Sequence, residues 1–175
     1  MEILILAVVT LPLLTALFLK VASRFLNELL TNFITINAAL LSVAVSFFMF
    51  GYLLLDKFKP IKFELFEWYP SPQIIFEFYL DGLSGVMMVL ISGLSLVIQL
   101  FSTSYMSKDE KYTKYFEYFN FFVFSMLLLV LSGNFLVMFF GWELVGLSSY
   151  SVSYTHLRAH ETPEHLVFRL VLEKK

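Results

Sequence analysis

Five long stretches with almost no charged side chains constrain the fold of this chain more than any other feature. They cover residues 3–19, 33–55, 81–101, 116–131 and 135–150, and the segments between them hold most of the charged residues. The longer stretches have about twenty residues, the number that an α-helix needs to cross a hydrocarbon core of about 30 Å. We therefore predict an all-α membrane protein with five transmembrane helices.

The composition agrees with a lipid environment and excludes several kinds of function. Hydrophobic residues make up 59% of the chain and charged residues only 15%, which is far from the balance of a water-soluble domain. A formal net charge of -2 gives no basic surface for nucleic acid. The chain has no cysteine, so it contains no disulfide, no thiolate nucleophile and no cysteine ligand for an iron–sulfur cluster. We expect the lipid bilayer as a partner, and no nucleic acid.

The distribution of lysine and arginine predicts the orientation of the helices. Five of these residues lie in the first and third loops: Lys20, Arg24, Lys108, Lys111 and Lys114. The second loop has three, Lys57, Lys59 and Lys62, and the fourth has none. Because loops rich in lysine and arginine stay in the cytoplasm, the amino terminus is predicted on the outer side. The acidic start, with Glu2 before the first apolar stretch, is unlike a secretory signal and indicates an uncleaved first helix.

The second loop has the pattern of a small extramembrane hairpin. Between residues 56 and 78, apolar side chains alternate with charged ones from Ile61 to Leu65, and Pro70 and Pro72 interrupt the run before it resumes. Alternation with a period of two and a proline-rich break is typical of two strands and a turn. An irregular amphipathic loop remains the alternative.

The third apolar stretch begins with Asp81 and carries glycine and serine at spacings of three and four, which allow helices to approach closely in lipid. We expect Asp81 to cap this helix, since a carboxylate at an amino end accepts hydrogen bonds from free amides. Gln99, near the other end, either lines a hydrated path or lies at the membrane surface.

The fifth stretch contains Glu143 within the sequence FGWELVGLSSY. Glu143 follows Leu136 by seven residues, which places it on the order of 10 Å into the helix at 1.5 Å per residue. A buried carboxylate costs about 2.5 to 3.5 kcal/mol at the centre of a membrane helix and usually faces a protein interior or a water-filled path. Glu143 is therefore our candidate functional residue. The alternative is a purely structural ion pair with a basic residue.

The last 25 residues, 151–175, differ from the rest and contain all three histidines: His156, His160 and His165. A zinc helix needs two histidines four residues apart with a glutamate after the first. His160 and His165 are five apart and Pro163 lies between them, while His156 and His160 alone make a weak site. We expect no metal.

The amino-acid sequence of this tail indicates an origin different from that of residues 1–150. Residues 152–162, VSYTHLRAHET, match the translation of a transposase sequencing adapter residue for residue. We therefore predict that residues 1–150 are native, that residues 151–175 are an artefact to be left out of the fold, and that the fifth helix is truncated at Tyr150. A genuine soluble tail is the alternative.

Three stretches carry a resemblance to a known family: FYLDGLSGVMM from Phe78, YMSKDEKYTKYFEYFNFFVFSMLLLVLSGNFLVMF from Tyr105, and FGWELVGLSSY from Phe140. Together they resemble the amino-terminal part of the L chain, or chain 5, of proton-pumping NADH:quinone oxidoreductase, respiratory complex I. The resemblance covers most of residues 1–150.

This resemblance implies an antiporter-like helical bundle that translocates protons, with no flavin, iron–sulfur cluster, NADH site or other cofactor in this chain. It implies the other membrane subunits of complex I as partners and a multi-pass location in the inner (cytoplasmic) membrane. Glu143 matches the family's fifth-helix glutamate, whose partner is a lysine on a later helix. Gln99 stands where many members carry a histidine, which puts a proton-relay role there in doubt.

Two other interpretations compete with a complex I subunit. The large subunit of an Mrp-type cation/proton antiporter shares the fold and the membrane glutamate, but the GWELVGLSSY sequence favours complex I. A truncated fragment that inserts into the membrane and translocates nothing is the other interpretation.

Overall fold

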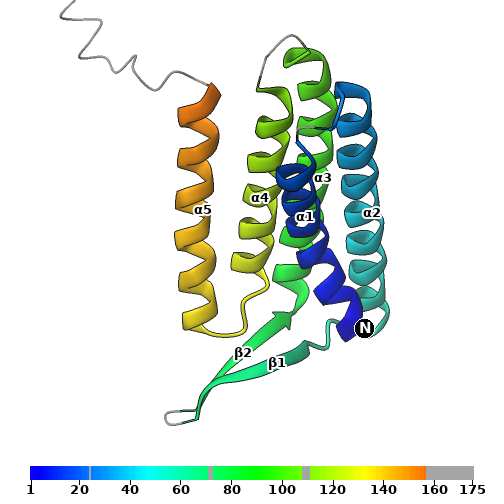
Figure 1. Cartoon of the computed structure of the whole chain (residues 1–175). Helices are drawn as coiled ribbons and strands as arrows, with labels where there is room; N and C mark the ends of the chain where they lie inside the picture. Colours follow the sequence, from blue (N-terminus) through cyan, green and yellow to red (C-terminus); the bar gives the residue numbers. More distant parts are fainter. Residues whose placement is uncertain (24, 71–72, 108–110, 157–175) are drawn as a thin grey trace, which may run out of the picture.

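Five helices lie side by side in a bundle, and a two-stranded hairpin lies at one end of it (Figure 1). The computed structural model describes residues 1–23, 25–70, 73–107 and 111–156. The helices are α1 (Glu2–Ala22), α2 (Glu28–Leu55), α3 (Gly82–Tyr105), α4 (Tyr112–Val130) and α5 (Phe135–His156), and the strands are β1 (Ile61–Pro70) and β2 (Gln73–Leu80). The predicted helical membrane fold is confirmed, with most helices a few residues longer than their apolar stretches.

Helix α4 differs from the other four in how it is stabilised. In the described part of the chain, α1, α2, α3 and residues Phe135–Val152 of α5 are long and apolar enough to cross a membrane. α4 has Lys114 and Glu117 near its start and is not in that group. It lies inside the bundle, in contact with all four other helices, and its buried side chains include Phe116 and Leu127. Packing, more than hydropathy, therefore fixes its position.

Helix α5 continues past Tyr150, where the sequence predicted its truncation. The helix runs to His156, and the Ser151 hydroxyl donates a 2.9 Å hydrogen bond to the Leu147 carbonyl. An α-helix needs only local backbone hydrogen bonds, so the residues after Tyr150 extend it whatever their origin. The predicted tail lies mainly in residues 157–175, including His160 and His165, which are outside the described residues.

The main hydrophobic core contains buried residues of all five helices and of β2. Its fully buried members include Ile5 of α1, Met88 of α3 and Leu127 of α4. Phe78 and Leu80 of β2 belong to the same core, so the hairpin is packed onto the bundle and does not hang free. In lipid these side chains stabilise the bundle through close van der Waals packing, because the surrounding lipid tails are as apolar as the core.

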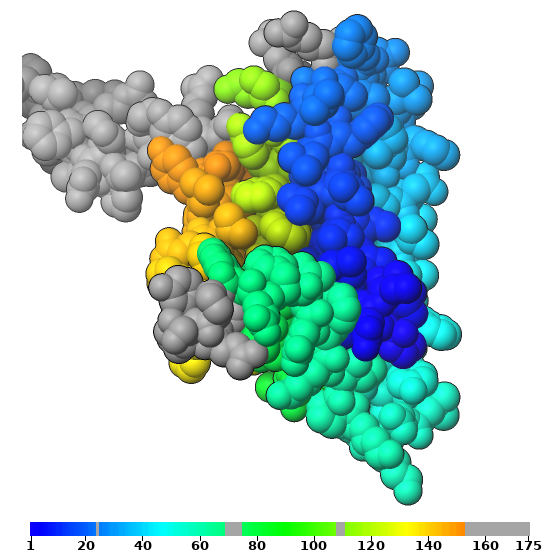
Figure 2. Space-filling view, turned by 60° about the horizontal axis from the view of Figure 1, so that its bottom comes forward, coloured from blue at the N-terminus to red at the C-terminus, as the bar shows by residue number. Residues whose placement is uncertain are grey.

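The hairpin predicted from the alternating pattern is confirmed. β1 and β2 pair antiparallel from Ile61 opposite Leu80 to Pro70 opposite Gln73, with irregularities after Glu64 and after Glu67. Figure 2 shows the hairpin across the end of the bundle, between the start of α1 in dark blue and α5 in yellow and orange. The amino terminus, the hairpin and the α4–α5 turn thus share one end of the bundle, and which side of the membrane that end faces remains a prediction.

Asp81 caps α3 as expected. Its carboxylate accepts a 2.8 Å hydrogen bond from the Ser84 backbone amide, and the Ser84 hydroxyl accepts a 2.7 Å bond from the Asp81 amide. This reciprocal pair is a capping box. The bond from the Ser84 amide holds the pKa of Asp81 below its ordinary value, against the opposing effect of partial burial.

We expect Asp81→Ala to destabilise the chain by about 1 kcal/mol at neutral pH, because it removes a helix cap. The folded pKa of Asp81 is lowered, so its stabilisation is present above the unfolded value of 3.8 and is lost as the pH falls through the folded pKa. Thermal unfolding in detergent from pH 7 downwards measures this difference. Asp56→Ala is the control, since the side chain of Asp56, at the carboxyl end of α2, forms an exposed 3.9 Å ion pair with Lys59. An equal loss in both variants would contradict the capping role.

Candidate functional site

Glu143 lies on the exposed face of α5. The helix buries Val137, Gly141 and Ser148, whereas Glu143 and its neighbour Trp142, which is 67% exposed, are on the other face. These five helices do not bury Glu143, and its burial stays a prediction. Because α5 makes its main contacts with α4, the helices that are present can cover only one of its sides.

No positive charge is close to Glu143 in the described part of the chain. The lysines lie near helix ends and in the hairpin, and none of them forms an ion pair with Glu143 within 4.0 Å. Glu143 is the eighth residue after Phe135, so it lies on the order of 12 Å along α5. The structure therefore places Glu143 far from the start of α5, and its carboxylate has no charged partner among the described residues.

Gly141, two residues before Glu143, allows α5 to approach α4 closely. A Cβ atom at this position would lie 2.7 Å from the Leu129 Cα atom and 2.8 Å from its backbone nitrogen. Both contacts are with backbone, which cannot rotate away as a side chain can. The glycine thus sets the spacing of the two helices at the level of Glu143, the kind of small-residue contact that helices in lipid use.

The hairpin holds the turn that leads into α5, a contact that we did not predict. The Tyr79 amide donates a 2.8 Å hydrogen bond to the Leu131 carbonyl, and the Gly133 amide donates a 2.9 Å bond to the Glu77 carbonyl. The Asn134 side-chain amide donates to the Ile75 carbonyl at 2.6 Å. Its side-chain oxygen also accepts from the backbone amide of Val137 at 3.0 Å.

Two aromatic rings extend this contact. Trp68 of β1 stacks on Phe140 of α5, with ring centroids 4.9 Å apart. The start of α5 is therefore attached to the hairpin as well as to α4. In the sequence, the one signal of this contact is Asn134, because asparagine is a preferred amino-terminal cap of a helix.

Gln99 lies in a second polar region, inside the bundle. It is 1% exposed, so its side chain faces the inside of the bundle. It lies beside Pro12, Ser42, Ser95 and Asn120 in a packed region that has no room for a water molecule. The Gln99 Oε1 atom and the Ser42 hydroxyl have no hydrogen-bond partner there.

The environment of Gln99 is polar but uncharged. The Asn120 amide donates to the Phe116 carbonyl at 2.8 Å, and the Ser95 hydroxyl donates to the Ser92 carbonyl at 2.7 Å. The described lining contains no lysine, arginine, histidine or acidic side chain. An unpaired buried polar group costs about 1 to 3 kcal/mol. Gln99 and Glu143 share no hydrogen bond, so the structure does not bring the two candidates together.

Comparison with known proteins assigns the family. The family described as NADH-Ubiquinone oxidoreductase (complex I), chain 5 N-terminus, matches residues 68–116. A protein named NADH-quinone oxidoreductase subunit L from Buchnera aphidicola subsp. Schizaphis graminum is 36% identical over 145 residues, which is 82% of this chain and 24% of that protein. The chain belongs to the subunit L (chain 5) family of complex I, and it corresponds to the amino-terminal part.

A second relative gives the same result. The NADH-ubiquinone oxidoreductase chain 5 of Allomyces macrogynus is 35% identical over 148 residues, 83% of this chain and 23% of the relative. This member of the subunit L family thus spans about a quarter of the length of the curated relatives it matches. It is a multi-pass membrane protein, as its apolar helices require.

A solved structure has the same fold. The membrane-bound sulfane sulfur reductase, described as an archaeal respiratory membrane complex, contains a chain that matches with a TM-score of 0.74 at 19% identity. The match covers 86% of this chain and 30% of that one. At this identity the likeness shows the fold alone, and it therefore does not separate a complex I subunit from an antiporter.

Proposed function

We propose that this chain is the amino-terminal part of a membrane subunit that takes part in proton translocation coupled to NADH:quinone electron transfer. The observation that carries this proposal is the relation, at 35 to 36% identity, to proteins named as subunits of NADH-quinone and NADH-ubiquinone oxidoreductases. Those names also favour complex I over an Mrp-type antiporter. The other membrane subunits of such a complex are the proposed partners, and an inner (cytoplasmic) membrane with the amino terminus outside is the proposed location.

Glu143 is the residue that we propose carries the proton. A carboxylate facing hydrocarbon in mid-helix costs about 2.5 to 3.5 kcal/mol, so a lipid-facing Glu143 is unfavourable. The relative from Buchnera is about three and a half times as long as this chain, which leaves room for further helices to cover the exposed face of α5. A covered Glu143 would then face a protein interior, where a charged partner can control its protonation.

The chemistry requires two states of that partner. A positive charge beside Glu143 favours the carboxylate, and its removal leaves a desolvated acid that binds a proton. A conformational change that moves the partner therefore loads or releases one proton. Gly141 and the hairpin support this role by fixing α5 while other helices move. No cofactor is needed at Glu143 for these steps.

The experiment that tests the function is a chimera. Residues 1–150 replace the corresponding part of subunit L in a bacterial NADH-quinone oxidoreductase, so that the residues 151–175 are left out. We expect the complex to assemble and to acidify the interior of inverted vesicles when NADH is added, because the replaced helices keep their packing surfaces. The measurement is proton pumping per NADH oxidised. An assembled complex that oxidises NADH at the normal rate and pumps as little as one lacking subunit L would contradict the proposal and favour a non-functional fragment.

A further inference from the structure

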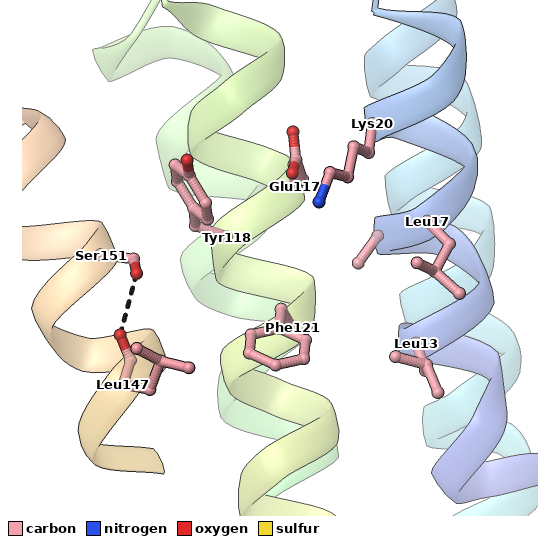
Figure 3. A pocket seen from close by; sticks show the side chains of 9 residues that line it. Leu13, Leu17, Lys20, Glu117, Tyr118, Phe121, Leu147 and Ser151 are labelled. Carbon is pink, nitrogen blue, oxygen red and sulfur yellow. Dashed lines mark hydrogen bonds between the residues drawn. The ribbon is translucent and has the colours of Figure 1, made fainter. Parts of the chain in front are cut away.

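The second half of α5 has few close contacts with the rest of the bundle. Figure 3 shows a groove at this level, with Leu147 of α5 on one side, Phe121 of α4 at its floor, and Leu13 and Leu17 of α1 on the other side. The groove has a volume of about 240 Å³. Among the described helices, α5 makes its main contacts with α4. Packing in this half of the helix therefore does little to restrict its rotation about its own axis.

Hydropathy does not fix the rotation of α5 either. Phe139, Trp142 and Leu147 are 57%, 67% and 57% exposed, so large apolar side chains already face outward. Lipid tails are as apolar as these side chains, so the exchange of one apolar face for another changes the free energy little. The rotation has to be set by directional contacts, such as hydrogen bonds or close packing of backbones.

The hairpin supplies such contacts at the start of α5. The turn between α4 and α5 runs along the edge of β2, where Ser132 pairs with Phe78 as an isolated antiparallel bridge. The bond from the Gly133 amide to the Glu77 carbonyl belongs to the same pairing. Backbone hydrogen bonds therefore extend the sheet into the turn and fix the turn to the hairpin.

Asn134 joins this attachment to the first turn of α5. Its side-chain oxygen accepts a 3.0 Å hydrogen bond from the Val137 amide, as an amino-terminal cap does. Its side-chain amide donates a 2.6 Å bond to the Ile75 carbonyl of β2. One planar group is therefore bonded to the helix on one side and to the hairpin on the other. The stacking of Trp68 on Phe140 adds a contact further along α5.

We propose that the hairpin sets the rotation of α5 and that Asn134 is a positioning residue for Glu143. Each residue of an α-helix is turned by about 100° from the one before, so Glu143 lies about 200° round α5 from Gly141. Because Gly141 lies against α4, the carboxylate faces away from α4 and toward the side that is open to a partner. A rotated α5 would turn it elsewhere. The consequence for proton transfer rests on the proposed function of Glu143, whereas the rotation itself does not.

Spin labels along α5 test the rotation in the whole 175-residue chain in phospholipid vesicles. The chain has no cysteine, so one cysteine introduced at each position from 142 to 148 in turn carries the only nitroxide. Electron paramagnetic resonance measures collisions of the nitroxide with dissolved oxygen, which report how far a position faces lipid. We expect these collisions to oscillate along the helix with a period of about 3.6 residues. The minimum is expected at Ser148, which is buried.

Asn134→Ser separates the two hydrogen bonds of Asn134. Serine caps a helix about as well as asparagine, but its shorter side chain does not reach the Ile75 carbonyl. We expect circular dichroism to show unchanged helix content. The population of the native orientation relative to rotated ones is expected to fall about fivefold, the effect of one hydrogen bond, so that the oscillation flattens. Trp68→Leu changes no residue of α5 and is expected to flatten the oscillation as well.

Asn37→Ser is the matched control. Asn37 is exposed on α2 and donates a 2.6 Å bond to the Phe33 carbonyl of its own helix, so this variant is expected to keep the full oscillation. A full oscillation in Asn134→Ser, or equal flattening in Asn37→Ser, would overturn the proposal.

Proton pumping by the chimera is a separate measurement of the same variant. Asn134→Ser is expected to lower the number of protons moved per NADH while NADH is oxidised at the normal rate. The loss is expected to be partial, because in the chimera later helices also contact α5. A flattened oscillation together with full pumping would overturn the link to Glu143 and would support the role of the hairpin in the rotation of α5.

Discussion

Glu143→Gln in the chimeric complex is expected to reduce proton pumping severalfold while NADH oxidation and assembly continue. Glutamine has nearly the same size and hydrogen-bonds with its neighbours, but it cannot take up or release a proton. Removal of a positioned acid or base typically costs about 100-fold or more in the step it serves. Because we propose that the other membrane subunits take part in translocation as well, we expect a smaller loss in the total pumping. The measurement is the ratio of protons moved to NADH oxidised in inverted vesicles.

The control for this prediction is Glu64→Gln, which makes the same substitution in the hairpin outside the bundle. It is expected to leave the ratio of protons to NADH unchanged. Glu143→Asp is a second useful variant, because it keeps the proton-binding group and shortens its reach, so that partial pumping is expected. A Glu143→Gln complex that assembles and pumps at the full ratio would remove Glu143 from the mechanism.

Gly141→Leu is expected to destabilise the chain by about 1 to 3 kcal/mol or more, the usual cost of overpacking a tight contact. The new side chain would enter space that the backbone of Leu129 occupies, where even a Cβ atom would lie 2.7 Å from the Leu129 Cα. α5 must therefore move away from α4. Unfolding of the helices with increasing sodium dodecyl sulfate, followed by circular dichroism, measures the change.

Gly146→Leu is the matched control in the same helix. A Cβ atom at Gly146 meets nothing within 4 Å, and the residue is on the exposed face. Leucine favours the helix over glycine by about 1 kcal/mol, so this variant is expected to be as stable as the wild type or more stable. The same loss of stability in both variants would show that the α4–α5 contact is not limited by Gly141.

The elements of this fold could be predicted from local patterns. Apolar runs of membrane length gave the helices, the alternation from Ile61 to Leu65 gave the hairpin, and Asp81 gave the start of α3. Each of these signals depends on hydrogen bonds or burial within a few residues of the chain, so neighbouring residues suffice to specify it. The end of α5 was not predictable in this way, because an apolar run that stops does not oblige a helix to stop.

The candidate site could be predicted only in part. The residue type of Glu143 and its depth in an apolar helix were evident, but the face on which it lies was not. α5 is apolar on nearly all sides, so its sequence pattern does not indicate which side packs on α4. Gln99 differs from Glu143 in the opposite direction. Its polarity allowed a position on the surface, but the structure buries it beside Ser42 and Asn120, where it is 1% exposed.

The sequence by itself determined that this chain crosses a membrane, the order of its elements and the family to which it belongs. The tertiary structure alone decided that the hairpin holds the start of α5, that Gly141 sets the distance between α4 and α5, and that Gln99 lies beside Ser42 and Asn120. The physical reason is the range of the interactions. Hydropathy and capping act between neighbours in the chain, whereas these contacts join residues far apart in sequence and exist only after the helices have packed.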